Sequence, residues 1–169
     1  MSAHRIPAAH FGPDTLEFLR ALTAHGVEFL IVGGEAVIFY GNARYTGDID
    51  VFYRITPENV QRLFQALCDF WGESLPGLSS PADLQEPERI VQFGLPPWRI
   101  DVMNDIDGVS FDQAWADSVE AEVAGSGAPF RVRYIGLDSL IRNKAAAGRS
   151  KDMEDLRFLE SLRRRRESE

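Results

Sequence analysis

The feature that most constrains this chain is an apolar segment that leads into two glycines and then into a helix-compatible segment. Residues 27–32 (VEFLIV) resemble a strand, Gly33 and Gly34 follow at once, and residues 35–40 (EAVIFY) suit a helix. Backbone amides converge at the start of a helix, and glycine has no Cβ to block a close approach. A glycine pair alone is more often a structural turn, but this junction is also typical of a phosphate-binding turn.

Two aspartates lie one residue apart in the next strand-like segment, residues 46–52 (TGDIDVF). Side chains alternate faces along a strand, so Asp48 and Asp50 point to one side and the hydrophobic residues between them to the other. Residues 99–103 (RIDVM) repeat this alternation, so a neighbouring strand can bring in Asp101. Magnesium prefers oxygen ligands, usually a few carboxylates together with substrate phosphates. The three aspartates therefore predict a site for Mg²⁺ or Mn²⁺ that faces a triphosphate.

The order of these signals is more specific than any one of them. A glycine pair, two aspartates on a strand and a later strand aspartate resemble the nucleotidyltransferase superfamily that includes DNA polymerase beta. The resemblance covers most of the chain, and within the superfamily the chain is similar to small bacterial proteins grouped with AbiEii-type abortive-infection toxins. It implies an α/β (α+β) fold, with a mixed sheet, flanking helices and a C-terminal helical pair. The matching segments are 31–37, 41–51, 99–102 and 140–156.

The resemblance also implies roles for individual residues. Asp48 and Asp50 would bind the metal ions, Asp101 would be a further ligand that helps to deprotonate the acceptor hydroxyl, and Gly33-Gly34 would cradle the phosphates of a nucleoside triphosphate. One departure concerns the residue after the glycines. Many catalytic members place Ser or Thr near this turn, whereas this chain has the anion Glu35. Glu35 either points away along the helix or weakens the triphosphate contact.

Three basic residues are candidates for nucleotide binding. Arg44 precedes the aspartate pair, where a cation either binds triphosphate or neutralises excess negative charge. Lys144 and Lys151 flank the junction between the two C-terminal helices; an exposed, ion-paired helix surface is the alternative, but the resembling families also place basic residues here. Asp152 and Asp155 are expected in the first turn of the last helix, where acids stabilise its positive end.

Hydrophobic periodicity and turn residues predict the remaining elements. Trp71, Trp98 and Trp115 are expected to pack in the core or at a sheet edge rather than to form base-stacking platforms. Residues 1–136 are expected to form a nucleotidyltransferase core, and residues 137–169 a helical extension packed on it, within one compact domain. Helices are predicted at 13–24, 57–71, 111–118, 137–147 and 150–165, and strands at 27–32, 48–52, 90–93, 98–102 and 130–135.

Composition narrows the class of protein. The net charge is −8 and the sequence pI is about 4.9, which argues against a polymerase that binds long duplexes nonspecifically. Cys68 is the only cysteine, so no intrachain disulfide is expected, and no disulfide-linked partner. The chain lacks an apolar run of 18 residues and a signal-peptide pattern, so we expect a cytoplasmic protein without a membrane partner.

The residues do not identify the acceptor. An RNA or tRNA end, as in toxin–antitoxin systems, a small-molecule alcohol such as an aminoglycoside, and a protein hydroxyl all stay open. The expected partners are a nucleotide and either RNA/tRNA or a cognate antitoxin protein. The alternative of a different class is a catalytically weak or inactive binding or antitoxin module. Glu35 and the acidic composition favour that alternative, whereas Asp48, Asp50 and Asp101 favour the enzyme.

Overall fold

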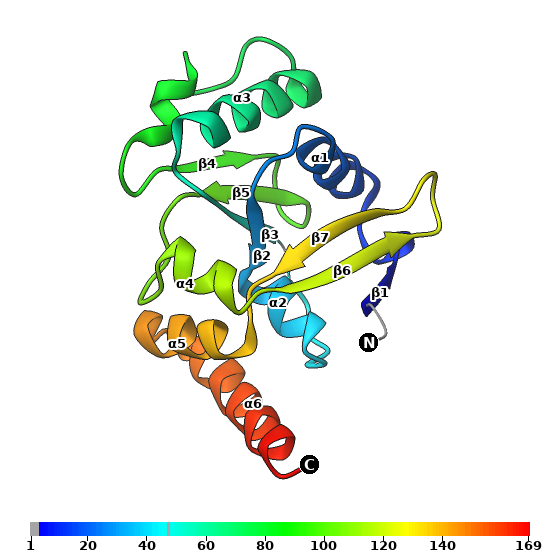
Figure 1. Cartoon of the computed structure of the whole chain (residues 1–169), viewed down its shortest axis with the longest axis vertical. Coiled ribbons are helices and arrows are strands. Elements are labelled where there is room, and N and C mark those ends of the chain that lie inside the picture. Colours follow the sequence, from blue (N-terminus) through cyan, green and yellow to red (C-terminus); the bar gives the residue numbers. More distant parts are fainter. Residues whose placement is uncertain (1–3, 47) are drawn as a thin grey trace.

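The computed structural model describes residues 4–46 and 48–169; Gly47 of the aspartate motif lies outside these residues. Within this part of the chain, seven strands form one mixed sheet in the order β1-β6-β7-β2-β3-β5-β4, flanked by helices (Figure 1). The predicted fold class is confirmed. The strands are β1 (His4–Pro7), β2 (Phe29–Val32), β3 (Asp48–Tyr53), β4 (Ile90–Phe93), β5 (Arg99–Met103), β6 (Val119–Ala124) and β7 (Phe130–Tyr134). The helices are η1 (Ala8–His10), α1 (Pro13–Ala24), α2 (Gly33–Phe39), α3 (Pro57–Trp71), η2 (Pro81–Gln85), α4 (Phe111–Ala116), α5 (Leu137–Ala147) and α6 (Ser150–Glu167).

Most predicted elements are present within one or two residues of the predicted bounds, and three differences bear on the fold. Strand β2 begins at Phe29 rather than Val27, because the Val27 amide still donates to Leu22 O at the end of α1 (3.0 Å). Helix α2 begins at Gly33 itself rather than after the glycine pair. Strands β1 and β6, which pair with each other in parallel, were not predicted.

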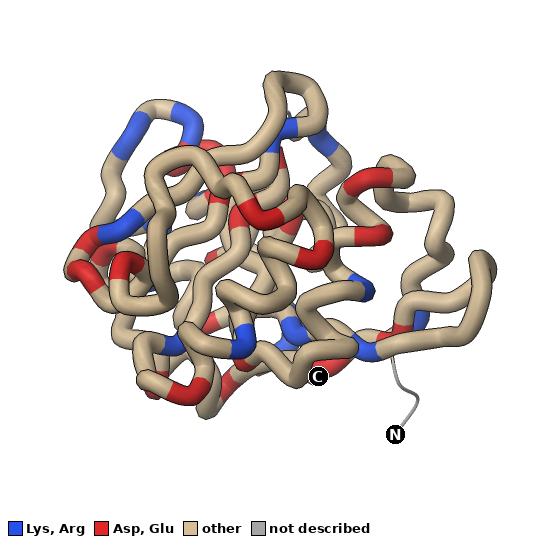
Figure 2. Tube along the Cα trace, turned by 90° about the horizontal axis from the view of Figure 1, so that it is seen from above, with Lys and Arg blue, Asp and Glu red and all other residues tan. Residues whose placement is uncertain are grey.

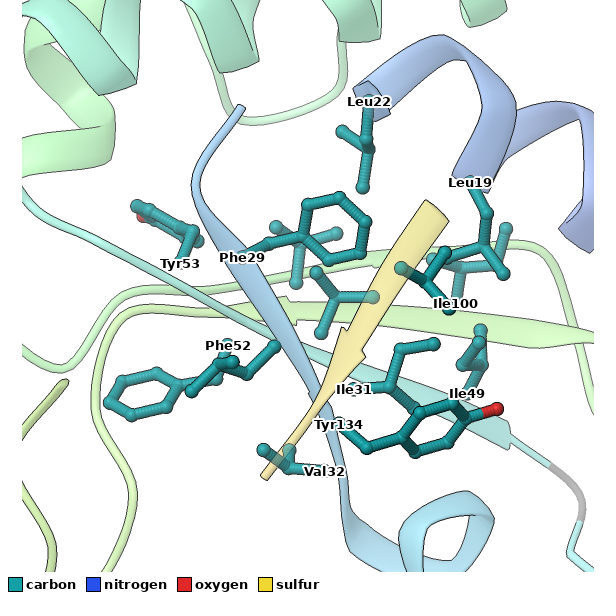
Figure 3. Packing of buried hydrophobic residues seen from close by; sticks show 14 of the residues in the cluster. Leu19, Leu22, Phe29, Ile31, Val32, Ile49, Phe52, Tyr53, Ile100 and Tyr134 are labelled. Atoms are coloured by element: carbon teal, nitrogen blue, oxygen red, sulfur yellow. The ribbon is translucent and has the colours of Figure 1, made fainter. Parts of the chain in front are cut away.

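The two faces of the sheet differ in chemistry at β3 and β5. These strands are parallel, with Asp48 opposite Arg99 and Asp50 opposite Asp101, so four charged side chains share one face. The alternate residues are buried on the other face, where Ile49 and Ile100 are register partners. Figure 3 shows Leu19 of α1 directed toward this apolar face. The core therefore fixes the strands whose opposite face carries the aspartates.

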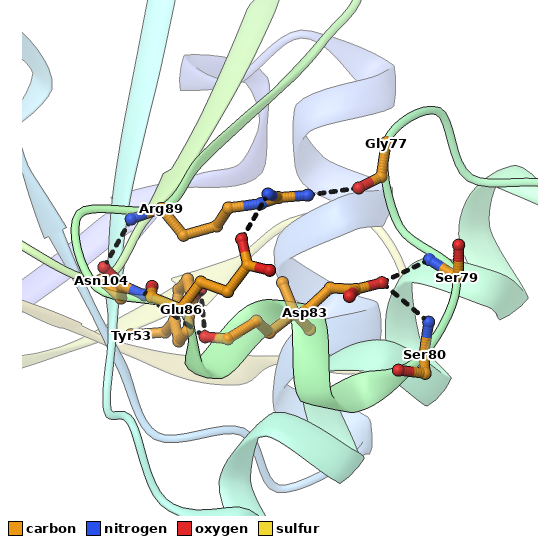
Figure 4. Close-up of polar contacts among 9 residues, drawn as sticks. Tyr53, Gly77, Ser79, Ser80, Asp83, Glu86, Arg89 and Asn104 are labelled. Carbon is orange, nitrogen blue, oxygen red and sulfur yellow. Dashed lines mark hydrogen bonds and ion pairs between the residues drawn. The ribbon is translucent and has the colours of Figure 1, made fainter.

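A polar network holds the segment between α3 and β4 against the sheet (Figure 4). The Asn104 side chain accepts a hydrogen bond from the Arg89 amide (2.9 Å) and donates to Glu86 O (2.7 Å) and Leu84 O (3.3 Å). Tyr53 of β3 donates to Leu84 O (2.8 Å). These bonds place β4 beside β5 as an antiparallel partner, which adds Ile90 and Gln92 to the face that carries the aspartates.

The two C-terminal helices pack on each other and on the strand-rich part of the chain. Leu140, Ile141 and Leu159 belong to the same buried hydrophobic cluster as the sheet. Helix α5 ends at Gly148, whose positive φ of 63° allows the sharp turn into α6. The division at residues 136/137 stays a prediction. No helix within residues 4–46 and 48–169 is long and apolar enough to cross a membrane.

Candidate active site

A cavity of about 580 Å³ lies on the charged face of the sheet, next to the junction of α5 and α6. It brings together strand residues, the glycine turn and the C-terminal helices, which are distant in sequence. All the residues predicted for metal or nucleotide binding line this one cavity: Gly33, Gly34, Arg44, Asp48, Asp50, Asp101, Lys144 and Lys151.

Asp50 and Asp101 lie side by side on β3 and β5. Burial, followed by the negative charges of Asp101 and Asp48 and a hydrogen bond to Asp101, raises the pKa of Asp50 to about 6, although Lys144 acts in the opposite direction. Three carboxylates cannot all ionise at low cost in such a partly buried place, because like charges disfavour one another. A bound cation would relieve this repulsion and favour the ionised form of Asp50.

Arg99 is a site residue that the sequence analysis did not assign. Its guanidinium donates to Asp101 through Nε (2.9 Å, to Oδ1) and Nη2 (3.1 Å, to Oδ2), and Nη2 also reaches Asp48 Oδ2 (2.8 Å). The hydrogen bond to Asp101 raises the pKa of Arg99 above its ordinary value. The alternation of residues 99–103 could have identified Arg99 as a site residue, since Arg99 and Asp101 are two positions apart and therefore lie on the same face of the strand.

The donor set suits a divalent cation of the magnesium type. All three aspartates offer oxygen ligands, and Asp48 Oδ1 is buried without a hydrogen-bond partner. Within the described residues, however, no three acidic, His or Cys side chains already converge as a metal site requires. Arg99 lies between Asp48 and Asp101 and would compete with a metal ion for the oxygens that it contacts, whereas Asp48 Oδ1 stays available.

The glycine pair allows the chain to pass close to these side chains. Gly33 has a φ of +65°, and a Cβ there would collide with the Asp50 carboxylate. A Cβ on Gly34 would lie 2.7 Å from Arg44 Nη2 and 2.9 Å from Thr46 Oγ1. Side chains therefore approach the backbone of both glycines closely, and the same backbone lines the cavity.

Residues 13–169 match the family described as "Nucleotidyl transferase of unknown function (DUF2204)". The chain belongs to this family. No curated protein matches the chain significantly. Membership supports the predicted nucleotidyltransferase superfamily, and it leaves metal, substrate and acceptor open.

In this DUF2204 protein, Lys144 is buried rather than part of an exposed helix surface, with only 2% of the residue accessible. Its Nζ lies 3.0 Å from Asp152 Oδ1 and 3.0 Å from Asp155 Oδ2. Asp155 also pairs with Arg44 (3.3 Å). The two aspartates thus do more than stabilise the end of α6, because they tie α6 to α5 and to the loop before β3. Lys151, by contrast, is exposed.

Glu35 points away from the main cavity. Its Oε1 lies 2.6 Å from His10 Nε2 and accepts a hydrogen bond from the Tyr134 hydroxyl at 3.3 Å. The hydrogen bond with Glu35 raises the pKa of His10, although burial acts against it. The carboxylate is therefore neutralised by a neighbour and does not line the cavity that holds Gly33 and Gly34.

Charged residues of both signs are spread over the molecule (Figure 2). Basic and acidic segments are interspersed around the chain rather than separated onto two faces (Figure 2). In the main cavity, the basic side chains of Arg44, Lys144, Arg149 and Lys151 accompany the carboxylates despite the net charge of −8. The site therefore has a local set of cations suited to phosphate groups.

Proposed function

We propose that this protein is a metal-dependent nucleotidyltransferase that moves a nucleoside monophosphate from a nucleoside triphosphate to a hydroxyl acceptor. The observation that carries the proposal is the meeting of three strand aspartates, a glycine turn and several basic side chains in one cavity. Family membership supports nucleotidyl transfer. Asp48, Asp50 and Asp101 would hold Mg²⁺ or Mn²⁺, and Arg44, Lys144 and Lys151 would contact the triphosphate.

In the proposed reaction, the acceptor oxygen bonds to the α-phosphorus and the bond to the leaving pyrophosphate breaks. Asp101 accepts the proton of the acceptor hydroxyl. The Gly33-Gly34 backbone leaves room for the phosphates, and Lys144 and Arg44 offset their negative charge. Bound divalent ions would lower the proton affinity of the hydroxyl and neutralise charge on pyrophosphate.

The acceptor in this proposal is an RNA end, with tRNA as the first case to test. The support is the resemblance of the sequence motifs to AbiEii-type toxins, which the family match leaves open. On the same resemblance we propose a cognate antitoxin protein as the partner and the cytoplasm as the location. A small-molecule alcohol and a protein hydroxyl are the alternative acceptors.

The test incubates the purified protein with each labelled nucleoside triphosphate, Mg²⁺ or Mn²⁺, and total RNA, a protein extract or an aminoglycoside. The control is the Asp48→Asn/Asp50→Asn double variant, which keeps side-chain size and removes the charges. Label transferred by the wild type alone supports the proposal and identifies the acceptor class. No transfer, together with no metal-dependent triphosphate binding in calorimetry, contradicts it.

One observation favours a second candidate function, a weakly active or inactive binding or antitoxin module. Arg99 already satisfies Asp101 with two hydrogen bonds and Asp48 with one, in the place where a metal ion is proposed. For this candidate we expect nucleotide binding without transfer to any acceptor. The same labelling experiment separates the two functions when calorimetry is run alongside it.

A further inference from the structure

A second cavity, of about 230 Å³, adjoins the proposed active site. The loop before β3, the segment before β5 and the first residues of α1 surround it. It shares five lining residues with the main cavity: Arg44, Tyr45, Thr46, Asp48 and Arg99. A ligand that extends from the main cavity can therefore reach the second one beside Asp48.

Two exposed aromatic side chains line this second cavity. Tyr45 is 79% exposed and Trp98 is 62% exposed. The other tryptophans pack as expected, since Trp71 stacks on Phe93 and Trp115 on Phe111. Trp98 departs from the expectation that all three tryptophans are packing residues.

The indole of Trp98 is held in place from one side. Gly12 lies beneath it so closely that a Cβ on Gly12 would be 2.9 Å from Cε3 and Cζ3 of the indole. One part of the ring is thus fixed against the backbone before α1, while most of the residue stays open to solvent. A large aromatic surface that is both supported and exposed is typical of a stacking platform.

We infer that the second cavity binds the nucleobase of the donor nucleotide, stacked on Trp98 with Tyr45 beside it. This inference rests on the proposed function. Arg44 lines both cavities and lies next to Gly34, so a nucleotide with its phosphates at the glycine turn has its base within reach of Trp98. Asp101, the proposed proton acceptor, lines only the main cavity, which places the acceptor on the side of β4 and β5.

The charges around the second cavity also fit a neutral aromatic ring. Glu35 is paired with His10, and Asp48 with Arg99. Each carboxylate thus already has a basic partner, which weakens its attraction for a polycation such as an aminoglycoside. Stacking on an aromatic face is available to every base, so this subsite favours nucleobases in general over other groups.

The experiment measures dissociation constants for the four nucleoside triphosphates and for inorganic tripolyphosphate by calorimetry in the presence of Mg²⁺. Trp98→Ala is expected to weaken nucleoside triphosphate binding about 10-fold, which is the order of a lost base stack. Trp98→Phe keeps a ring and is expected to restore most of the affinity. Tripolyphosphate has no base, so its affinity is expected to stay unchanged in both variants.

The matched control is Leu95→Ala. Leu95 is 81% exposed in the same loop but lines neither cavity, so its replacement is expected to leave all affinities unchanged. Equal nucleotide affinity in wild type and Trp98→Ala overturns the inference while the proposed function stands. Weakened acceptor binding alone in Trp98→Ala overturns the assignment to the donor. If the wild type binds neither nucleotide nor tripolyphosphate, the proposed function and the inference fall together.

Discussion

Replacement of the buried lysine, Lys144→Met, is the perturbation whose effect follows most directly from the structure. Lys144 contacts two buried aspartates, Asp152 and Asp155, each at 3.0 Å. Methionine fills a similar volume but leaves these carboxylates without their shared cation. The variant therefore separates the charge of Lys144 from its packing.

The expected loss can be worked out from the partners that remain. Removal of one partner from a buried ion pair typically costs about 3–5 kcal/mol, because an uncompensated charge is left behind. Here Asp152 keeps Arg149 (2.7 Å) and Asp155 keeps Arg44 (3.3 Å). Burial raises the pKa of Asp152, but its hydrogen bonds with Arg149 and Lys144 outweigh this effect and lower it. Partial compensation places the loss of unfolding free energy near the lower end, at about 3 kcal/mol.

Urea unfolding measures this loss. With a slope of about 2 kcal/mol/M, the midpoint of Lys144→Met should fall by about 1.5 M. Lys151→Met is the control, since this exposed lysine lines the same cavity and its loss should change stability by less than about 0.5 kcal/mol. Adding Asp152→Asn to Lys144→Met should recover part of the loss. Equal midpoints for the two lysine variants would refute the reasoning.

Three further substitutions, together with Gly34→Ala as a control, test the carboxylate face. Gly33→Ala should cost about 1–2 kcal/mol of stability from its left-handed φ alone, and its new Cβ should abolish Mn²⁺ binding by colliding with Asp50. Gly34→Ala should keep Mn²⁺ binding, because its Cβ would meet the side chains of Arg44 and Thr46 instead. Urea unfolding measures the stability of both variants, and calorimetry measures their Mn²⁺ binding. Asp50→Asn should raise stability at pH 7.5 by up to about 3 kcal/mol and leave it nearly unchanged near pH 3. The reason is that folding raises the Asp50 pKa from 3.8 to about 6, so the wild type loses stability as the pH rises through this window; equal gains at both pH values would contradict this. Arg99→Gln should tighten Mn²⁺ binding at least about threefold, because a competing cation is removed; weaker binding would show that Arg99 positions the aspartates instead.

The carboxylate face was accessible from sequence because strand alternation is a local rule. Asp48 and Asp50 share a face by parity alone, and the parallel pairing of β3 with β5 adds Asp101, as predicted. The helices at 13–24 and 137–147 were also predicted to the residue, since proline or glycine punctuates their ends. The alternation and the helix ends depend on neighbours within a few residues, whereas the pairing of β3 with β5 joins segments that are far apart in the sequence.

The missed features depend on tertiary partners. Strand β6 reads VEAEVA, where Glu and Ala are weak strand formers, and only its pairing with β1 and β7 makes it a strand. An exposed, ion-paired surface was one expectation for Lys144, but the residue is buried against two aspartates of the following helix, and its contact with nucleotide stays a prediction. Glu35 was suspected of weakening the phosphate turn, but His10, far upstream, holds it elsewhere. Glu35 and the acidic composition were the two sequence arguments for an inactive module, and the position of Glu35 removes the first of them.

The charge balance of the main cavity bears on the order in which ligands bind. Its lining has a formal charge of −1, from Asp48, Asp50, Glu88, Asp101, Asp105 and Asp107 against Arg44, Arg99, Lys144, Arg149 and Lys151. Such a lining does not attract a polyanion, but two divalent cations would make it +3. Removal of divalent metal with EDTA is therefore expected to abolish nucleoside triphosphate binding itself, and not only the transfer step. Calorimetry with and without EDTA tests this, and unchanged tripolyphosphate binding in EDTA would show that the basic side chains hold the phosphates unaided.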